Sequence, residues 1–367
     1  MPTTHTEPAT PAPAVRRLCW YRRPGGRGFL LLWTLCLLSG CAFLDPRQKD
    51  PPPPGVAEEG TLCVDGLPER LLIRGSDPAH NPVLLFVHGG PGFPAAPFRQ
   101  VNSDLERYFT VVHWDQRGTG YSYRPDLPPD TLRVEQFVRE TLQVTHALCR
   151  KFGQRRLYLV GHSWGTLPAL LAAEREPQCF HAYIALSQLV DVHESEHRLT
   201  EAAFRHAHAN DDPARARALR SVGPPPYRDL PDLDRASSLV TGLFPRVPNQ
   251  ATAFRLALLA LSSRYYPLDA LFRVNAGYRF SRRIILPQLS AYDLRRDVPR
   301  VGMPVYFFVG REDSTFGVSL QREYYERLAA PRGKTFVLFS KSTHWPHLEQ
   351  PREFLRQMLL VRAQTWR

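Results

Sequence analysis

The pentapeptide Gly-His-Ser-Trp-Gly at residues 161–165 holds the serine of this chain that is best placed for chemistry. The apolar run 157–160 precedes it, and an apolar segment typical of a helix follows. A serine on so tight a turn between a strand and a helix is strained, and its hydroxyl is exposed at the end of a sheet. Short patterns also occur by chance. The prediction that Ser163 is a nucleophile therefore depends on whether its chemical partners are present.

A glycine-rich loop, His-Gly-Gly-Pro-Gly at residues 88–92, directly follows the apolar run 83–87. Such a loop at the end of a strand leaves backbone N–H groups free to bind a developing negative charge. The residue after the nucleophile, Trp164, is expected to provide a second N–H donor. An ordinary turn would need fewer glycines and prolines than this loop contains. We therefore interpret the loop as one side of an oxyanion hole.

A carboxylate that could orient a catalytic base follows the apolar run 304–309, which is typical of a buried parallel strand. The next four residues are Gly-Arg-Glu-Asp. An acid on a loop of this kind can accept the Nδ1 proton of a histidine and fix its tautomer. We predict that Asp313 has this role, and the adjacent Glu312 is the alternative.

The candidate base follows the last predicted strand, 335–339, in a segment Ser-Lys-Ser-Thr-His that ends at His344. A loop directly after a strand suits a base that must reach Ser163. His347 is the alternative, but it lies where the chain enters a helix and is expected to cap that helix or to pack. The order serine, aspartate, histidine along the chain is that of an α/β-hydrolase and differs from the orders in chymotrypsin and subtilisin.

Three motifs together resemble those of the proline iminopeptidase (prolyl aminopeptidase) group of α/β-hydrolases. They are residues 88–92, the segment Trp-Asp-Gln-Arg-Gly-Thr-Gly-Tyr-Ser at 114–122, and residues 161–165. The resemblance extends over roughly residues 60–360. By position it implies a nucleophile, an acid, a base and two oxyanion-hole N–H donors, respectively Ser163, Asp313, His344, Gly90 and Trp164. It also implies that Asp115 and Arg117 brace the loop beside the oxyanion hole.

Strands and helices alternate along most of the chain, which predicts a mostly parallel sheet with helices on both faces. Strands are expected near 69–74, 83–87, 110–114, 156–160, 182–186, 304–309 and 334–339, and helices near 133–152, 163–175, 317–329 and 350–362. The intervening segment lacks long β-branched runs and shows helical spacing of its apolar residues. We therefore predict an α/β class and an α/β-hydrolase fold, with a catalytic domain at 61–188 and 287–367 and an inserted helical cap at 189–286.

Two glutamates near the start of the predicted cap, Glu194 and Glu196, are candidates for binding the substrate. The resemblance implies that cap glutamates, in a setting that contains tryptophan, bind the free amino group of the substrate. This chain departs from that pattern, because its six tryptophans all lie outside the predicted cap. A desolvated carboxylate near the nucleophile would still select a cationic terminus. The alternative is a solvated charge pair at the start of a helix.

The N-terminal residues resemble a secretory signal that ends in a bacterial lipobox. Five arginines precede a short apolar run at 29–38, and Leu-Ser-Gly-Cys then ends at Cys41. These features predict a signal peptide over 1–40, lipid attachment to Cys41 and a proline-rich tether over 41–60. The apolar run is well under the ~20 residues that span a bilayer, which disfavours a permanent anchor helix. We expect an exported protein of the bacterial cell envelope that its lipid anchors to a membrane.

Charge and cysteine content exclude other classes of function. The formal net charge is +12, and loss of residues 1–40, with five arginines and one glutamate, would leave 12 − 4 = +8. The positive charge is scattered arginine, so no nucleic-acid partner is expected, although a weak attraction to anionic lipid headgroups remains open. Three cysteines outside the signal and the lipid site are expected to be small buried side chains: Cys63, Cys149 and Cys179. No Cys/His spacing resembles a zinc site, and neither a metal nor an organic cofactor is expected.

Together these features predict a serine hydrolase that forms an acyl-enzyme on Ser163, with His344 as the base. The favoured activity is release of an N-terminal residue from a short peptide, as the resemblance implies. One alternative is a carboxylic-ester hydrolase, an esterase or lipase, with the same triad. The other is a non-catalytic surface lipoprotein that keeps the fold as a binding scaffold.

Overall fold

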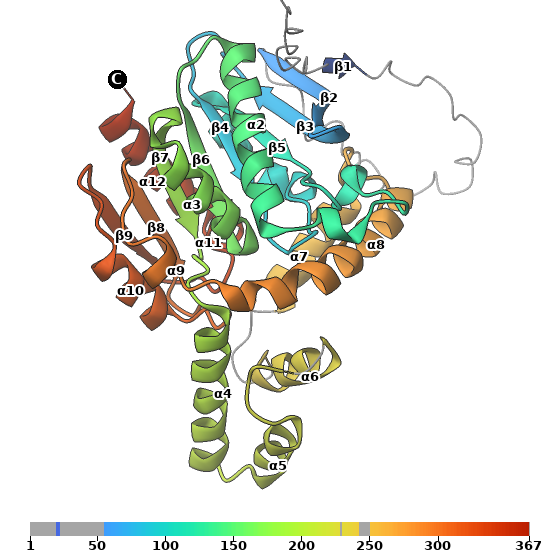
Figure 1. Cartoon of the computed structure of the whole chain (residues 1–367), viewed down its shortest axis with the longest axis vertical. Coiled ribbons are helices and arrows are strands. Elements are labelled where there is room, and N and C mark those ends of the chain that lie inside the picture. Colours follow the sequence, from blue (N-terminus) through green and yellow to red (C-terminus); the bar gives the residue numbers. More distant parts are fainter. Residues whose placement is uncertain (1–19, 23–54, 228–229, 242–249, 367) are drawn as a thin grey trace, which may run out of the picture.

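The computed structural model describes residues 20–22, 55–227, 230–241 and 250–366, and one sheet forms the centre of the fold (Figure 1). Nine strands of the described chain lie in the order β1-β2-β3-β5-β4-β6-β7-β8-β9. Their bounds are β1 Trp20–Arg22, β2 Val56–Val64, β3 Leu67–Gly75, β4 Val83–Val87, β5 Thr110–Trp114, β6 Leu157–His162, β7 Phe180–Leu186, β8 Val305–Gly310 and β9 Lys334–Phe339. The strands from β5 to β9 in this order are parallel, whereas β1, β2 and β3 pair antiparallel at one side.

Helices cover both faces of the parallel part of the sheet (Figure 1). One face packs against α2 (Val134–Phe152), α3 (Thr166–Arg175) and α10 (Val318–Arg327). The other packs against α12 (Pro351–Thr365) and the 3₁₀ helix η2 (Ala96–Arg107). Successive residues of a strand point to opposite faces, so Leu85 joins the first core and Phe86 the second. Two short helices, α9 (Leu294–Asp297) and α11 (Pro346–Glu349), complete this part of the fold.

The parallel strands are continuous apolar runs because they are covered on both sides. Every residue of β4, β6 and β8 is buried. Neither face meets water, so these strands lack the alternation of apolar and polar residues that a half-exposed strand shows. The α/β class and the α/β-hydrolase fold predicted from the alternation of strands and helices are confirmed, as are the seven strands and four helices expected along the chain.

Strand β2 corrects one predicted boundary. Residues 56–60 were expected to belong to an extended tether, but they form the first half of β2 and pair with β3. This strand is only half-buried, so its glutamates and glycine give it little of the apolar character by which the inner strands are recognised. Strand β1 lies within the predicted signal peptide. The remaining residues of that segment, with Cys41, lie outside the described residues.

The described residues of the predicted cap region, 189–286, fold mainly into helices, which turns and short non-helical segments connect. Five helices lie in this described part: α4 Val192–Ala209, α5 Pro213–Val222, α6 Leu230–Thr241, α7 Gln250–Leu261 and α8 Leu268–Ile285. Helices α4, α5 and α6 form one group that projects from the sheet, while α8 runs along the edge of the sheet (Figure 1). Within the described parts of the chain, no helix is both long and apolar enough to cross a membrane.

Candidate active site

Ser163 lies on the sharp turn between β6 and α3, and the flanking glycines make this turn possible. The φ angle of Ser163 is 53°, in the left-handed region that residues with side chains seldom adopt. A Cβ atom on Gly161 would come within 2.8 Å of the Gly165 carbonyl oxygen, and one on Gly165 would clash with the carbonyl oxygen of Val87. The strained backbone costs of the order of 1–3 kcal/mol and directs the serine hydroxyl away from the sheet.

The structure brings the three predicted triad residues into one hydrogen-bonded line. The Nε2 atom of His344 lies 2.9 Å from the hydroxyl oxygen of Ser163, and its Nδ1 atom lies 3.0 Å from Oδ1 of Asp313. All three side chains are buried. A carboxylate at Nδ1 holds the proton there, which leaves Nε2 as the acceptor for the serine hydroxyl. This is the arrangement that a general base needs to activate Ser163.

Asp313 is held in its ionised form by its donors. Burial alone would raise the pKa of this carboxyl group, but the charge and hydrogen bond of His344 lower it. The backbone N–H of Thr315 donates to Oδ1 at 2.9 Å, and the Gln321 amide donates to Oδ2 at 3.0 Å. The net result is a pKa below the usual aspartate range. The carboxylate therefore stays charged and keeps the orientation of His344 fixed.

The two alternatives raised by the sequence lie elsewhere. Glu312 is exposed to solvent, although it is adjacent to Asp313. His347 is buried and packs its ring against His162, with centroids 4.7 Å apart, and against Phe86 at 5.5 Å. Burial lowers the pKa of His347 to about 3, so it stays neutral. His347 therefore packs in the core behind the site, as expected. The acid and the base that contact each other are Asp313 and His344.

The backbone of His344 is anchored by two residues that the sequence analysis did not assign. The carbonyl oxygen of His344 lies 3.1 Å from Nε2 of His162 and accepts a hydrogen bond from the Ser187 hydroxyl at 3.2 Å. Burial and the neighbouring histidines lower the pKa of His162 well below its usual value, so this ring is neutral. Nε2 must then carry its proton in order to donate to a carbonyl. Because His162 directly precedes Ser163, one strand end fixes both the nucleophile and the loop of the base.

The glycine-rich loop lies against the nucleophile turn. A Cβ atom on Gly89 would lie 3.1 Å from the Cβ of Ser163, so this loop needs glycine to approach so closely. Gly90 and Trp164 line the same cleft as Ser163. The backbone N–H of Gln116 donates to His88 Nε2 at 3.2 Å, and its amide donates to the His88 carbonyl at 2.9 Å. The Gln116 amide oxygen also accepts from the Trp164 indole at 3.1 Å. This network ties both sides of the predicted oxyanion hole to one residue.

The motif at 114–122 forms the buried support of that network. Asp115 accepts hydrogen bonds from the Tyr266 hydroxyl and from the Tyr121 backbone N–H, the latter at 3.2 Å. Arg117 donates to Glu140 on α2 at 2.6 Å, and both side chains are almost fully buried. Asp115 and Arg117 therefore hold the loop in place, the first through Tyr266 of the predicted cap and the second through Glu140 of α2. Neither of them lines the cleft at Ser163.

A cleft of about 930 Å³, counted with its open mouth, lies between Ser163 and the cap helices. Most of its lining is apolar and comes from the cap and from the loops at the carboxyl ends of the strands: Leu189, Val192, Leu199, Val240, Leu286 and Phe316. Polar side chains of the cap also line it, among them Glu196, Tyr227, Tyr278 and Arg282. The size fits a small ligand such as a short peptide or an ester.

The two candidate glutamates of the cap have different surroundings. Glu194 lies in the first turn of α4, and its side chain does not line the cleft. Its carboxylate instead forms an ion pair with Arg198 at 2.6 Å. Glu196 lines the cleft, and within the described chain it has no hydrogen-bond or ion-pair partner. Burial, with a smaller contribution from Asp191, raises the pKa of Glu196 to about 7. Only Glu196 is therefore placed to meet a ligand.

Sequence reasoning missed several residues of the site, and only some of them carried a signal. His162 lies inside the pentapeptide, and Gln116 lies inside the 114–122 motif. Their places next to the catalytic residues could therefore have been predicted from the sequence. Tyr227 and Arg282 lie in cap helices or loops whose packing the sequence pattern does not specify. Their presence in the cleft follows from the tertiary fold alone.

The fold and the geometry of the site define a class of protein, and comparison with known families agrees. The family model described as the alpha/beta hydrolase fold matches residues 82–351 of this chain. The match covers well over half of the chain, and the chain belongs to this family. It is a hydrolase of the α/β-hydrolase superfamily.

Within that family the chain is similar to proline iminopeptidases. A "probable aminopeptidase" of Bacillus subtilis strain 168 is 33% identical over 301 residues, which is 80% of this chain and 92% of the relative. A proline iminopeptidase of Heyndrickxia coagulans is 24% identical over 280 residues, covering 75% of this chain and 88% of the relative. The crystal structure of a proline iminopeptidase-related protein from Thermus thermophilus superposes with a TM-score of 0.61 at 25% identity, covering 85% of this chain and 99% of that one.

Proposed function

We propose that this chain is a serine hydrolase that releases N-terminal residues from short peptides through an acyl-enzyme. His344 takes the proton of Ser163, and the serine oxygen attacks the carbonyl carbon of the substrate. The N–H groups of Gly90 and Trp164 stabilise the resulting oxyanion. His344 then protonates the leaving amine, and a water molecule, activated by the same base, releases the acyl group. Asp313 stays ionised throughout and stabilises the imidazolium form of His344.

One observation supports the chemical step most directly. The side chains of Ser163, His344 and Asp313 form a continuous line with contacts of 2.9 and 3.0 Å, and the serine opens onto the cleft. The prediction follows that Ser163→Ala lowers kcat/KM by about 10⁴-fold or more. Covalent labelling of the wild type by a fluorophosphonate, absent in Ser163→Ala, measures the nucleophile independently of the substrate.

The aminopeptidase assignment rests on Glu196. An α-ammonium group that enters the cleft would meet a carboxylate that is half-buried and has no partner among the residues that the structure describes. Binding of that cation favours the ionised form of Glu196, so the pair forms together. The similarity to an aminopeptidase and to proline iminopeptidases supports the same assignment.

A direct test compares prolyl and other aminoacyl anilides with their N-acetylated forms. We expect turnover of the free-amine substrates only, and we expect Glu196→Gln to raise their KM by about 10-fold or more, because a hydrogen bond to a charged group is lost. Glu194→Gln is the matched control, since that residue pairs with Arg198 outside the cleft. Equal turnover of free and acetylated substrates would contradict the exopeptidase assignment.

A carboxylic-ester hydrolase is the second candidate, because the lining of the cleft is mostly apolar. An acyl chain could occupy the space between Val192, Leu199 and Phe316. Short-chain nitrophenyl esters measured beside the prolyl anilide distinguish the two activities. Efficient ester hydrolysis that Glu196→Gln leaves unchanged, together with no anilide turnover, would favour the ester hydrolase.

We also propose that the protein is exported and anchored by a lipid on Cys41. The arginine-rich segment, the short apolar run at 29–38 and the lipobox-like residues before Cys41 support this proposal. Mass spectrometry of the protein purified from bacterial membranes measures the modification. A mature chain that begins at an acylated Cys41 is expected, and Cys41→Ser is expected to stay unprocessed. An unmodified wild-type chain in the soluble fraction would contradict the proposal.

A further inference from the structure

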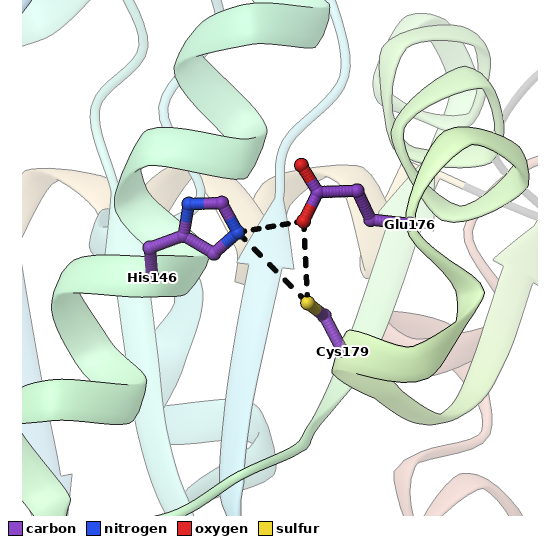
Figure 2. Close-up of side chains that lie close together, drawn as sticks. All are labelled: His146, Glu176 and Cys179. Atoms are coloured by element: carbon purple, nitrogen blue, oxygen red, sulfur yellow. Dashed lines mark hydrogen bonds and ion pairs between the residues drawn. The ribbon is translucent and has the colours of Figure 1, made fainter.

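A second group of chemically active side chains lies far from Ser163. His146 on α2, Glu176 at the end of α3 and Cys179 in the 3₁₀ helix η6 (Pro177–Cys179) converge on one point (Figure 2). Cys179 directly precedes β7, whereas Ser163 follows the carboxyl end of the neighbouring strand β6. The length of β7 separates the two groups by about 20 Å, at about 3.3 Å for each of its residues.

The three side chains present three different donor atoms to one another. Nε2 of His146 lies 2.7 Å from Oε2 of Glu176, and Sγ of Cys179 lies 3.4 Å from the same oxygen. Sγ of Cys179 and Nε2 of His146 are 3.9 Å apart. Figure 2 shows the imidazole, the carboxylate and the sulfur all directed inward to a common centre. An imidazole, a carboxylate and a thiol are the three ligand types that zinc prefers in proteins.

We propose that His146, Glu176 and Cys179 form a binding site for one divalent transition-metal ion, with zinc as the expected ion. The ligand distances of tetrahedral zinc, about 2.0–2.3 Å, place pairs of ligand atoms about 3.3–3.8 Å apart. The two separations that involve sulfur already fall close to this range. The contact between His146 and Glu176 must open by less than 1 Å, which rotation of the glutamate side chain provides.

The charge of the donor set fits a divalent cation. Metal binding requires a neutral imidazole, an ionised carboxylate and a thiolate, whose proton passes to solvent. These ligands carry two negative charges, which one divalent ion neutralises. Arg175, the nearest basic residue along the chain, is engaged by Glu135 through hydrogen bonds of 2.5 and 2.6 Å. It is therefore held by another carboxylate.

Access and the fourth position also fit. The side chains of His146 and Glu176 are 40% and 30% exposed, so an ion can reach them from solvent. Cys149 lies three residues after His146 on the same face of α2. The chain thus supplies a His-x-x-Cys segment and a Glu-x-x-Cys segment. The fourth ligand is then Cys149 or a water molecule.

The site would be structural. It joins the last turns of α2 to the connection between α3 and β7, and no residue of it lines the cleft at Ser163. No zinc site was predicted, because the spacing of cysteine and histidine alone does not reveal one here. One of the ligands is a carboxylate, and 26 residues separate Cys149 from Glu176, so the sequence shows no recognisable metal-binding motif.

Cobalt(II) titration of the tag-free, reduced full-length chain, freed of metal with a chelator, tests the proposal. We expect saturation at one equivalent, with a thiolate-to-cobalt charge-transfer band and the strong visible bands of tetrahedral cobalt. Zinc should displace the cobalt and so remove the charge-transfer band and the visible bands. Cys179→Ser should abolish the charge-transfer band if water is the fourth ligand and halve it if Cys149 is, and His146→Ala should weaken binding by about 10-fold or more. Absence of the band in the wild-type protein overturns the proposal.

Two controls separate a metal site from a simple hydrogen-bonded pair. Cys63→Ser removes another half-buried free cysteine, on β2, and should leave the cobalt spectrum unchanged. Thermal unfolding should show that zinc stabilises the wild type and does not stabilise Cys179→Ser. A cooperative unfolding transition of Cys179→Ser without metal shows that the variant is folded. A band of undiminished intensity in Cys179→Ser, or zinc stabilisation equal in both proteins, excludes the site. Loss of the charge-transfer intensity by half in Cys149→Ser identifies Cys149 as the fourth ligand, and an unchanged intensity identifies water.

Discussion

Asp313 lies at the buried end of a hydrogen-bonded line that passes through His344 to Ser163. Its carboxylate fixes which nitrogen of His344 carries the proton, and its pKa lies below the usual range because of the donors around it. At the scale of single residues, the predicted chemistry therefore depends on orientation and charge at Asp313 as much as on the serine itself.

Replacement of Asp313 by asparagine should leave the protein folded and almost inactive. The amide can donate to Nδ1 and so favours the wrong tautomer of His344, which lowers kcat by about 10⁴-fold. Steady-state kinetics and the rate of fluorophosphonate labelling measure the effect. Glu312→Gln, a change at the adjacent exposed acid, should retain wild-type rates. A variant Asp313→Asn with near-normal kcat would show that Asp313 does not have this role.

His162 should act as a positioning residue for His344. Loss of its donor in His162→Ala frees the His344 carbonyl and the loop of the base, which should lower kcat by between about 10- and 100-fold. KM should change little, because His162 does not line the cleft. His162→Gln keeps an N–H donor and should recover part of the rate when activity is expressed per labelled Ser163. Equal losses in both variants would indicate a packing role only.

Glu196 should make the preference for a free amino terminus depend on pH. With a pKa of about 7, Glu196 is mostly protonated at pH 6 and mostly ionised at pH 8. The ratio of kcat/KM for a prolyl anilide to that for a neutral ester should therefore rise as pH increases through 7. It should fall again above about pH 8, where the α-amino group of the substrate loses its proton. Any pH dependence that the two substrates share cancels in the ratio, and in Glu196→Gln the rise should disappear.

At this scale the sequence predicted which three side chains converge at the site, but it did not predict the residues around them. Ser163, Asp313 and His344 were readable because each follows a recognisable apolar strand, and the choice of Asp313 over Glu312 agrees with the burial of the one and the exposure of the other. The two cap glutamates could not be separated, because their difference depends on which side of α4 faces the cleft.

Among the structural elements, α2 connects the predicted oxyanion loop to the core. Its Glu140 accepts a hydrogen bond from Arg117 of the 114–122 motif and another from Gln136 one turn earlier. The Arg117 and Glu140 side chains are 3% and 0% exposed, so the pair is shielded from water. The geometry of the loop beside Ser163 therefore depends on a helix that never touches the substrate cleft.

Removal of one partner of this buried pair should be costly. Glu140→Ala leaves Arg117 charged and buried, and we expect the free energy of unfolding to fall by about 3–5 kcal/mol. Equilibrium unfolding in urea measures it. Glu135→Ala on the same helix removes an exposed partner of Arg175 and should cost under about 1 kcal/mol. A loss at Glu140 no larger than that at Glu135 would contradict this account.

The strands that were predicted and strand β2, which was not predicted, differ in burial. The inner strands, such as β4 and β8, are covered on both faces and read as unbroken apolar runs. Strand β2 is half-buried and includes Glu58, Glu59 and Gly60, so its composition resembles the polar segment before it. Its place in the sheet is decided by pairing with β3, a contact that local sequence patterns do not encode.

For the whole molecule, the chain leaves the sheet for the cap and returns at almost the same point. Asp191 and Asp293 form a short bridge, and the N–H of Leu294 donates to the Val190 carbonyl at 2.9 Å. Arg295 holds this junction through Asp293 at 2.8 Å and Asp191 at 3.1 Å. The ends of the helical region are therefore fastened together beside the sheet.

Arg295→Ala should loosen the helical region relative to the sheet. The variant loses the ion pairs of Arg295 with several carboxylates. We expect the free energy of unfolding to fall by about 1–2 kcal/mol, which is more than an isolated exposed ion pair contributes. Limited proteolysis should cleave residues 192–285 faster, and KM for the anilide should rise while the rate of labelling of Ser163 changes less. Arg296→Ala is the matched control, because that side chain is exposed and pairs only locally with Asp297. Equal proteolysis of both variants would refute the role of Arg295.

The junction at Asp191 and Asp293 has a consequence for how such a protein can diversify. Because both ends of the intervening segment meet in one place, a replacement of different length or shape needs to match only two neighbouring attachment points. The strand register and the hydrolytic centre would be unaffected by such an exchange. Selectivity can then change as an independent module, while the machinery that breaks the bond is inherited intact.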